Sequence, residues 1–131
     1  VVYRRFFWQN LRDGLDSTAA FWHVDSHAGG DGFDSLDCSG YNPKNRTDYG
    51  AVYADFNYGT VLSGRRFDAW HDGYTDYRLG RLCLKAIETL PNRDAKAKQL
   101  QSIFEAASEG SINEMEAARV KLLEFYEEVK K

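Results

Sequence analysis

The chain has 131 residues and a mass of 15.0 kDa, the size of one domain, and 43% of its residues are hydrophobic, enough to bury a core. Its net charge of −3 argues against a dedicated nucleic-acid binder, because neutralising phosphates needs clustered Lys and Arg. No apolar run reaches the roughly 18 residues of a membrane span, and no signal peptide is recognisable at the start. Cys38 and Cys83 form no metal-binding spacing and no disulfide framework, so the redox compartment stays open.

The first predicted elements are a helix and a buried strand. Apolar residues at helical spacing predict a helix over residues 1–13, with Gly14 as its C-terminal stop. The apolar run Ser17–Val24 has the length of a strand buried on both faces, as in a parallel sheet covered by helices. Residues 25–62, rich in Gly, Asp and aromatics, predict a long structured loop with a short strand at residues 51–54.

A long helical pattern follows, with Ser63 as its predicted N-cap, and runs toward Thr89. Its interior contains Gly73 and Gly80, each of which costs a helix about 1 kcal/mol relative to alanine. We therefore expect each glycine to mark a bend or a close approach of another backbone.

Two further helices are predicted in the last third of the chain. Pro91 opens the first of them, which ends at residues 109–110. Ser111 and Glu114 have the spacing of a capping box and open the last helix. Residues 91–131 are thus predicted to form a helical hairpin.

Two clusters invite comparison with metal sites. His23, Asp25 and His27 alternate at the end of the predicted strand and could ligate zinc or another metal, but we interpret them as a buried imidazole and two loop residues with ordinary hydrogen bonds. The stretch 31–37 has aspartates at every third position, whereas a calcium loop has them at every second, so we interpret these aspartates as turn formers. No metal and no cofactor is expected.

A third cluster is typical of carbohydrate sites. Trp22 lies near Asp25, His27 and Asp31, and an aromatic face beside carboxylates can stack on and hydrogen-bond a sugar ring. The alternative is a core tryptophan next to loop acids. The long helix carries six charged residues in its first turns, which we interpret as a solvated face or as i,i+4 pairs: Arg65, Arg66, Asp68, Asp72, Asp76 and Arg78.

Five stretches carry a resemblance, in the order Arg5-Phe-Phe-Trp-Gln-Asn-Leu-Arg-Asp-Gly-Leu-Asp16, Ala20-Phe-Trp22, Gly30-Asp-Gly32, Asp48-Tyr-Gly-Ala-Val-Tyr53 and Arg65-Arg-Phe-Asp-Ala-Trp-His-Asp-Gly-Tyr-Thr-Asp-Tyr77. Together they resemble the C-terminal end of the (β/α)8 barrels of glycoside hydrolase family 123 and its relatives. The resemblance implies an α/β fold, namely the closing segment of such a barrel (helix, buried strand, long loop, helix) followed by an α-helical hairpin extension. Because a complete barrel needs about 250 residues, the chain would be a fragment. The implied domains are residues 1–90, with the aromatic loop 25–62, and residues 91–131.

The resemblance implies a carbohydrate-active protein, with glycans containing N-acetylgalactosamine as the substrate class. No position matches the family's catalytic carboxylates, so no catalytic residue is expected here. Residues at the carboxyl end of a barrel strand line the pocket, which nominates a substrate-binding rim of Trp22, Asp25, His27, Asp31 and Tyr53. A structural role is expected for Arg66, Asp68, Asp72, Asp76 and Tyr77.

Two alternatives remain open at the level of the sequence. One is a non-catalytic glycan-binding, protein-binding or structural module, and the other is a small enzyme that uses His23, Asp25 and His27. The expected partners are a glycan and the remainder of the barrel or a second copy, and neither nucleic acid nor a membrane is expected. An extracellular or periplasmic location would follow from the family resemblance alone.

Overall fold

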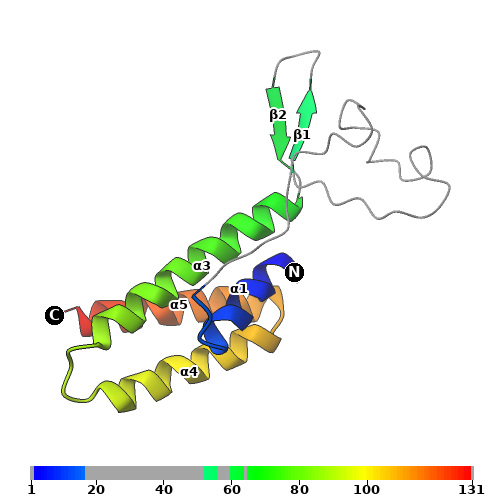
Figure 1. Cartoon of the computed structure of the whole chain (residues 1–131). Helices are drawn as coiled ribbons and strands as arrows, with labels where there is room; N and C mark the ends of the chain where they lie inside the picture. Colours follow the sequence, from blue (N-terminus) through cyan, green and yellow to red (C-terminus); the bar gives the residue numbers. More distant parts are fainter. Residues whose placement is uncertain (1, 17–51, 56–59, 64, 131) are drawn as a thin grey trace. The chain divides into compact units, whose positions relative to one another are not determined.

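The computed structural model of the chain describes residues 2–16, 52–55, 60–63 and 65–130. Contacts divide the chain into two compact units, one of residues 1–18 with 69–131 and one of residues 19–68. The described elements, drawn in Figure 1, are α1 (Val2–Arg12), β1 (Val52–Asp55), β2 (Thr60–Ser63), α3 (Arg65–Ile87), α4 (Arg93–Glu109) and α5 (Ile112–Val129).

Helix α1 ends in a Schellman motif built on a glycine. The N–H of Gly14 donates to the Leu11 carbonyl (3.2 Å), and the N–H of Leu15 donates to the Asn10 carbonyl (2.9 Å). Gly14 has a φ of 67°, a left-handed conformation that glycine adopts without a Cβ clash. The predicted helix and its stop are therefore confirmed.

Helix α3 approaches α1 closely at two glycines. A Cβ built on Gly73 would lie 2.4 Å from Phe7 Cδ2 and 2.9 Å from Arg4 Cα, and one on Gly80 would lie 2.7 Å from Leu11 Cδ1. The two glycines are seven residues apart, close to two helical turns, so they lie on the same face of α3. The predicted close approach of another backbone is thus confirmed at Gly73, whereas at Gly80 it is the side chain of Leu11 that comes close.

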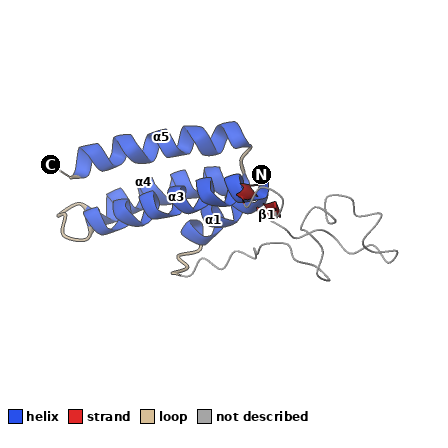
Figure 2. Cartoon of the chain, turned by 90° about the horizontal axis from the view of Figure 1, so that it is seen from above, coloured by secondary structure: helices blue, strands red, loops and turns tan. Residues whose placement is uncertain are grey.

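Helices α4 and α5 follow each other with only a short connection. The N–H of Glu114 donates to Ser111 Oγ (3.4 Å), and the Ser111 N–H donates to Glu114 Oε2 (2.6 Å), which confirms the predicted capping box. Helix α4 packs against both α1 and α5. Figure 2 shows α5 running beside α3 and α4, which overlap in this view.

All described helices contribute to one apolar core. Its buried residues are Phe7, Trp8 and Leu11 of α1, Tyr77, Cys83 and Ile87 of α3, Leu100, Phe104 and Ala107 of α4, and Met115, Ala118, Leu122 and Phe125 of α5. The aromatic rings interlock: the Phe7 ring meets those of Trp70 and Tyr74 edge to face, at centroid distances of 5.7 and 6.2 Å.

The second unit contains a small β-hairpin. Strands β1 and β2 pair antiparallel, with Val52 opposite Ser63 and Asp55 opposite Thr60. The predicted strand at residues 51–54 corresponds to β1, whereas β2 has no counterpart in the sequence prediction. Ser63, predicted to cap the following helix, is instead the last residue of β2.

The expectation of an α/β barrel-closing segment is wrong. The described helices bury their apolar faces on one another, and the described strands form one antiparallel pair, without the parallel sheet that a barrel helix would cover. The physical reason is that an apolar stripe on a helix can pack against a sheet or against other helices. The spacing of its apolar residues is the same in both cases, so the sequence pattern does not distinguish the two architectures. The predicted buried strand, Ser17–Val24, lies outside the described residues.

Candidate functional site

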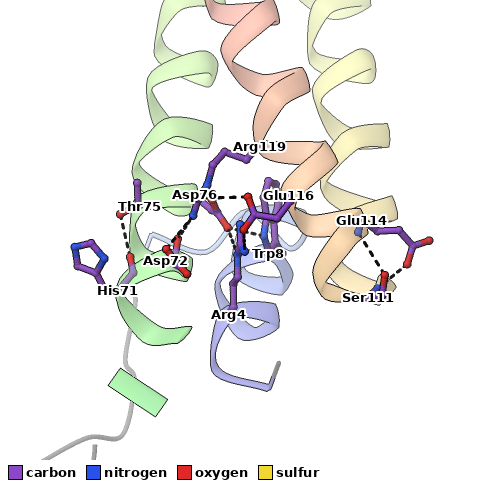
Figure 3. Close-up of polar contacts among 10 residues, drawn as sticks. All are labelled: Arg4, Trp8, His71, Asp72, Thr75, Asp76, Ser111, Glu114, Glu116 and Arg119. Atoms are coloured by element: carbon purple, nitrogen blue, oxygen red, sulfur yellow. Dashed lines mark hydrogen bonds and ion pairs between the residues drawn. The ribbon is translucent and has the colours of Figure 1, made fainter. Parts of the chain in front are cut away.

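Three helices meet at one buried carboxylate, Asp76 of α3, whose exposed fraction is 0%. Its Oδ2 accepts from Arg4 Nε at 2.7 Å and from Trp8 Nε1 at 3.0 Å, and its Oδ1 accepts from Arg119 Nε of α5. Figure 3 shows these donors converging on Asp76 from α1 and α5. Arg4 lies 72 residues from Asp76 in the sequence, and Arg119 lies 43 residues from it. The cluster therefore exists only in the folded chain.

Local helical periodicity explains why these side chains face one another. Arg4 and Trp8 are four residues apart and therefore share the inner face of α1. Asp76 lies three residues after Gly73, on the face of α3 that α1 approaches. The missing side chain of Gly73 lets the two backbones come close enough for the Arg4–Asp76 bond to form within the core.

Two further carboxyl residues surround the guanidinium groups. Glu116 accepts from Arg4 Nη1, and its Oε2 lies 3.9 Å from Arg119 Nη1. Arg119 Nη2 donates to the backbone carbonyl of Asp72 at 3.0 Å and lies 3.5 Å from Asp72 Oδ1. The cluster thus joins two cations to three carboxylates across α1, α3 and α5.

Burial and hydrogen bonding oppose each other at the centre of the cluster. Burial raises the pKa of Asp76, while the bonds from Arg4 and Arg119 act to lower it. Burial also acts to lower the pKa of Arg4, but its bonds to Asp76 and Glu116 outweigh this and raise it. Since both oxygens of Asp76 accept from N–H donors, the geometry favours the ionised carboxylate. The bond from Arg4 lowers the pKa of Glu116.

This arrangement is suited to holding helices together and not to proton transfer. A general base needs a lone pair that a substrate can reach, and Asp76 is buried with both oxygens occupied by donors. Removing one partner of such a cluster leaves an uncompensated buried charge. We therefore interpret the Asp76 cluster as a structural clamp between α1, α3 and α5.

An open groove of about 670 Å³ lies along α3 and the start of α4. Its lining combines cations with tyrosine and aliphatic side chains: Asp16, Tyr74, Tyr77, Arg78, Arg81, Leu82, Leu84, Lys85, Ile87, Glu88, Arg93 and Ala97. Arg81 Nη1 pairs with Asp16 at 2.7 Å, and the Arg78 guanidinium lies 5.9 Å from the centroid of the Tyr74 ring. Apart from Asp16 and Glu88, every charged lining residue is a cation.

The predicted substrate-binding residues are not brought together among the described residues. Trp22, Asp25, His27 and Asp31 lie outside them, and Tyr53 lies in β1. The same holds for His23, so the proposed zinc cluster also falls outside the described part of the chain.

The residues expected to be structural all belong to α3. Arg66 and Asp68 lie in its first turn, Asp72 and Asp76 contact Arg119, and Tyr77 Oη donates to the Leu15 carbonyl at 2.8 Å. This last bond ties α3 to the turn that follows α1.

Sequence reasoning missed the partners of Asp76, although a signal was present. Arg4 stands in line with Phe7, Trp8 and Leu11, on a stripe that is otherwise apolar. A lone cation within an apolar stripe indicates a buried carboxylate elsewhere in the chain, because a buried charge without a partner is too costly. The stripe does not identify the acidic residue that pairs with Arg4.

Two absences concern the described residues, one of a metal site and one of a membrane-spanning helix. No group of three or more His, Cys, Asp or Glu side chains placed to hold a metal ion occurs among the described residues. None of the helices in the described ranges is both long and apolar enough to span a bilayer.

Comparison of the chain with protein-family models, with curated proteins and with solved structures found no match. The resemblance to glycoside hydrolase family 123 therefore rests only on the residues quoted for it.

Proposed function

We propose that this chain is a non-catalytic module that binds a segment of a partner protein in the groove along α3. The observation that carries the proposal is the groove itself: about 670 Å³ of open space lined by aliphatic, tyrosine and charged side chains on a helical scaffold. Grooves between packed helices are a common place for proteins to bind peptide segments.

The buried polar chemistry of the helical unit supports a role without catalysis. Asp76, the most buried carboxylate among the described residues, holds three helices together and has no exposed surface. Cys83 is also buried, and burial raises the pKa of its thiol to about 11, which makes it a poor nucleophile near neutral pH. Neither group is placed to react with a substrate.

A random peptide library displayed on phage tests the proposal. The purified chain should enrich peptides that the same matrix without protein does not retain, and calorimetry on synthetic copies should show binding near one peptide per chain. Failure to enrich any peptide would refute the binding proposal. The same preparation should hydrolyse no chromogenic N-acetylgalactosaminide faster than buffer does, and turnover by the purified chain would refute the non-catalytic part.

A second candidate is glycan binding through Trp22, Asp25 and His27, favoured by the tryptophan and acidic residues gathered in that stretch. Calorimetry with a glycan containing N-acetylgalactosamine should show binding that Trp22→Phe weakens. Trp70→Phe, a change on the described part of α3, is the control; Trp8 is unsuitable because it is buried and donates to Asp76. Equal affinities for both variants would refute the glycan role of Trp22.

A further inference from the structure

The groove along α3 carries charge opposite to that of the chain. It is lined by the cations Arg78, Arg81, Lys85 and Arg93, against two acids, whereas the chain as a whole has a net charge of −3. Since Arg81 is already paired with Asp16, three cations remain to meet a ligand. Such a local concentration of one sign attracts a ligand of the other sign.

The groove also offers apolar contact surface. Leu82 is 47% exposed and Tyr74 36% exposed, and both belong to the lining, together with the half-buried Leu84. Tyr74, Arg78 and Leu82 follow one another at four-residue intervals, so they form a continuous row along α3. The row alternates an aromatic, a cationic and an aliphatic side chain.

This composition favours a peptide over the other anionic ligands. Aliphatic side chains in the lining suit the leucine or phenylalanine of a peptide, whereas a sugar site is built from aromatic faces and dense hydrogen-bonding groups. Nucleic acid is disfavoured because its affinity depends on neutralising many phosphates, and the groove is lined by only four cations. An acidic and amphipathic peptide matches both the cations and the aliphatic side chains of the lining.

The length of the groove favours a helical ligand. Its α3 wall runs from Tyr74 to Glu88, which corresponds to about 20 Å at the rise of an α-helix. An amphipathic helix of about four turns matches that length and presents apolar anchors at i, i+3, i+4 and i+7 on one face. Carboxylates flanking those anchors would face the cations.

We propose that the groove along α3 binds an acidic amphipathic helix of a partner protein, with its aliphatic side chains on Leu82 and Tyr74 and its carboxylates toward Arg78, Lys85 and Arg93. This inference rests on the proposed function and specifies the ligand that the same groove takes. Charge complementarity sets the orientation and the rate of association, and the apolar anchors supply most of the affinity.

The experiment uses the intact chain and the peptides that it enriches from the displayed library. Enriched peptides should carry more Asp and Glu than Lys and Arg, with apolar residues at helical spacing. Arg78→Glu combined with Lys85→Glu should weaken their binding at least tenfold, because both exposed cations become repulsive. Lys98→Glu combined with Lys121→Glu changes the net charge equally on α4 and α5, outside this groove, and should weaken binding less than twofold.

Circular dichroism checks that each variant remains helical, and Arg78→Gln with Lys85→Gln repeats the test with a smaller change of charge. Peptides that bind the Arg78→Glu/Lys85→Glu variant as tightly as the parent, or that are basic, would overturn the inference while leaving the binding proposal intact. Displacement of the peptides by a sulfated oligosaccharide at equal concentration would also overturn it, in favour of an anionic glycan. A chain that enriches no peptide at all would refute the proposed function itself.

Discussion

Replacing Gly73 by alanine tests how closely α1 and α3 are packed. In an ordinary helix interior this change stabilises by about 1 kcal/mol, because alanine has the higher helix propensity. Here the new Cβ would lie 2.4 Å from Phe7 Cδ2 and 2.9 Å from Arg4 Cα. The Arg4 contact is with backbone, so it is relieved only if the two helices move apart.

The expected magnitude follows from the opposing effects. Inserting a carbon into a packed core costs about 1 to 3 kcal/mol, and occasionally more. Moving α1 outward would also lengthen the bonds from Arg4 and Trp8 to Asp76, which are 2.7 and 3.0 Å long. The strain therefore exceeds the gain in propensity, and we expect Gly73→Ala to lower the free energy of unfolding by about 2 kcal/mol.

Urea unfolding followed by far-UV circular dichroism measures this difference. Thr75→Ala is the control, because Thr75 is exposed on the same helix and the change should leave stability the same or slightly higher. Gly80→Ala should cost less than Gly73→Ala, since its Cβ would meet only the side chain of Leu11, which can rotate. A Gly73→Ala protein at least as stable as the parent would show that the helices are not packed as described.

Three further predictions concern single groups. Asp76→Ala should destabilise the chain by about 3 to 5 kcal/mol in urea unfolding, because it removes the buried acceptor of Arg4 Nε, Trp8 Nε1 and Arg119 Nε; a loss below about 1 kcal/mol would contradict the clamp. In a Cys38→Ser background, Cys83 should react with a thiol reagent at pH 8 about 100-fold more slowly in the folded chain than in urea, since burial raises its pKa from 9.0 to about 11; equal rates would refute its burial. The hydrogen bond from the Ser111 backbone N–H lowers the pKa of Glu114 in the folded chain below its usual 4.5. The ionised Glu114 carboxylate therefore stabilises the fold above pH 4.5, and this stabilisation is lost as the pH falls through the pKa of Glu114 in the folded chain. Melting temperatures of the parent and Glu114→Gln should therefore differ more at pH 6 than at pH 3, and a constant difference would contradict the lowered pKa of Glu114.

Local features were predictable because their determinants lie within a few residues of one another. The stop of α1 needs one glycine with a positive φ, and the start of α5 needs a serine and a glutamate three residues apart. The start of α3 was placed less well. Ser63 has the chemistry of an N-cap, yet its backbone belongs to β2, which pairs with β1.

The prediction of a barrel segment was wrong about how the helices pack, although several of the helices themselves were predicted correctly. The helical stripes and the apolar run Ser17–Val24 are compatible with helices that cover a sheet, and the resemblance to a barrel favoured that choice. The described helices cover one another instead, with α4 against both α1 and α5.

The sequence by itself determined where α1 ends, where α5 begins and which helix faces are apolar, because caps, glycine stops and periodicity act over one or two turns. Only the tertiary structure decided which faces meet and what becomes of the charges within them. Arg4 and Asp76 each stand on an inward-facing stripe, 72 residues apart, and either could have been a solvated side chain. Their pairing depends on the close approach of α1 to Gly73, since burial makes each charge require the other.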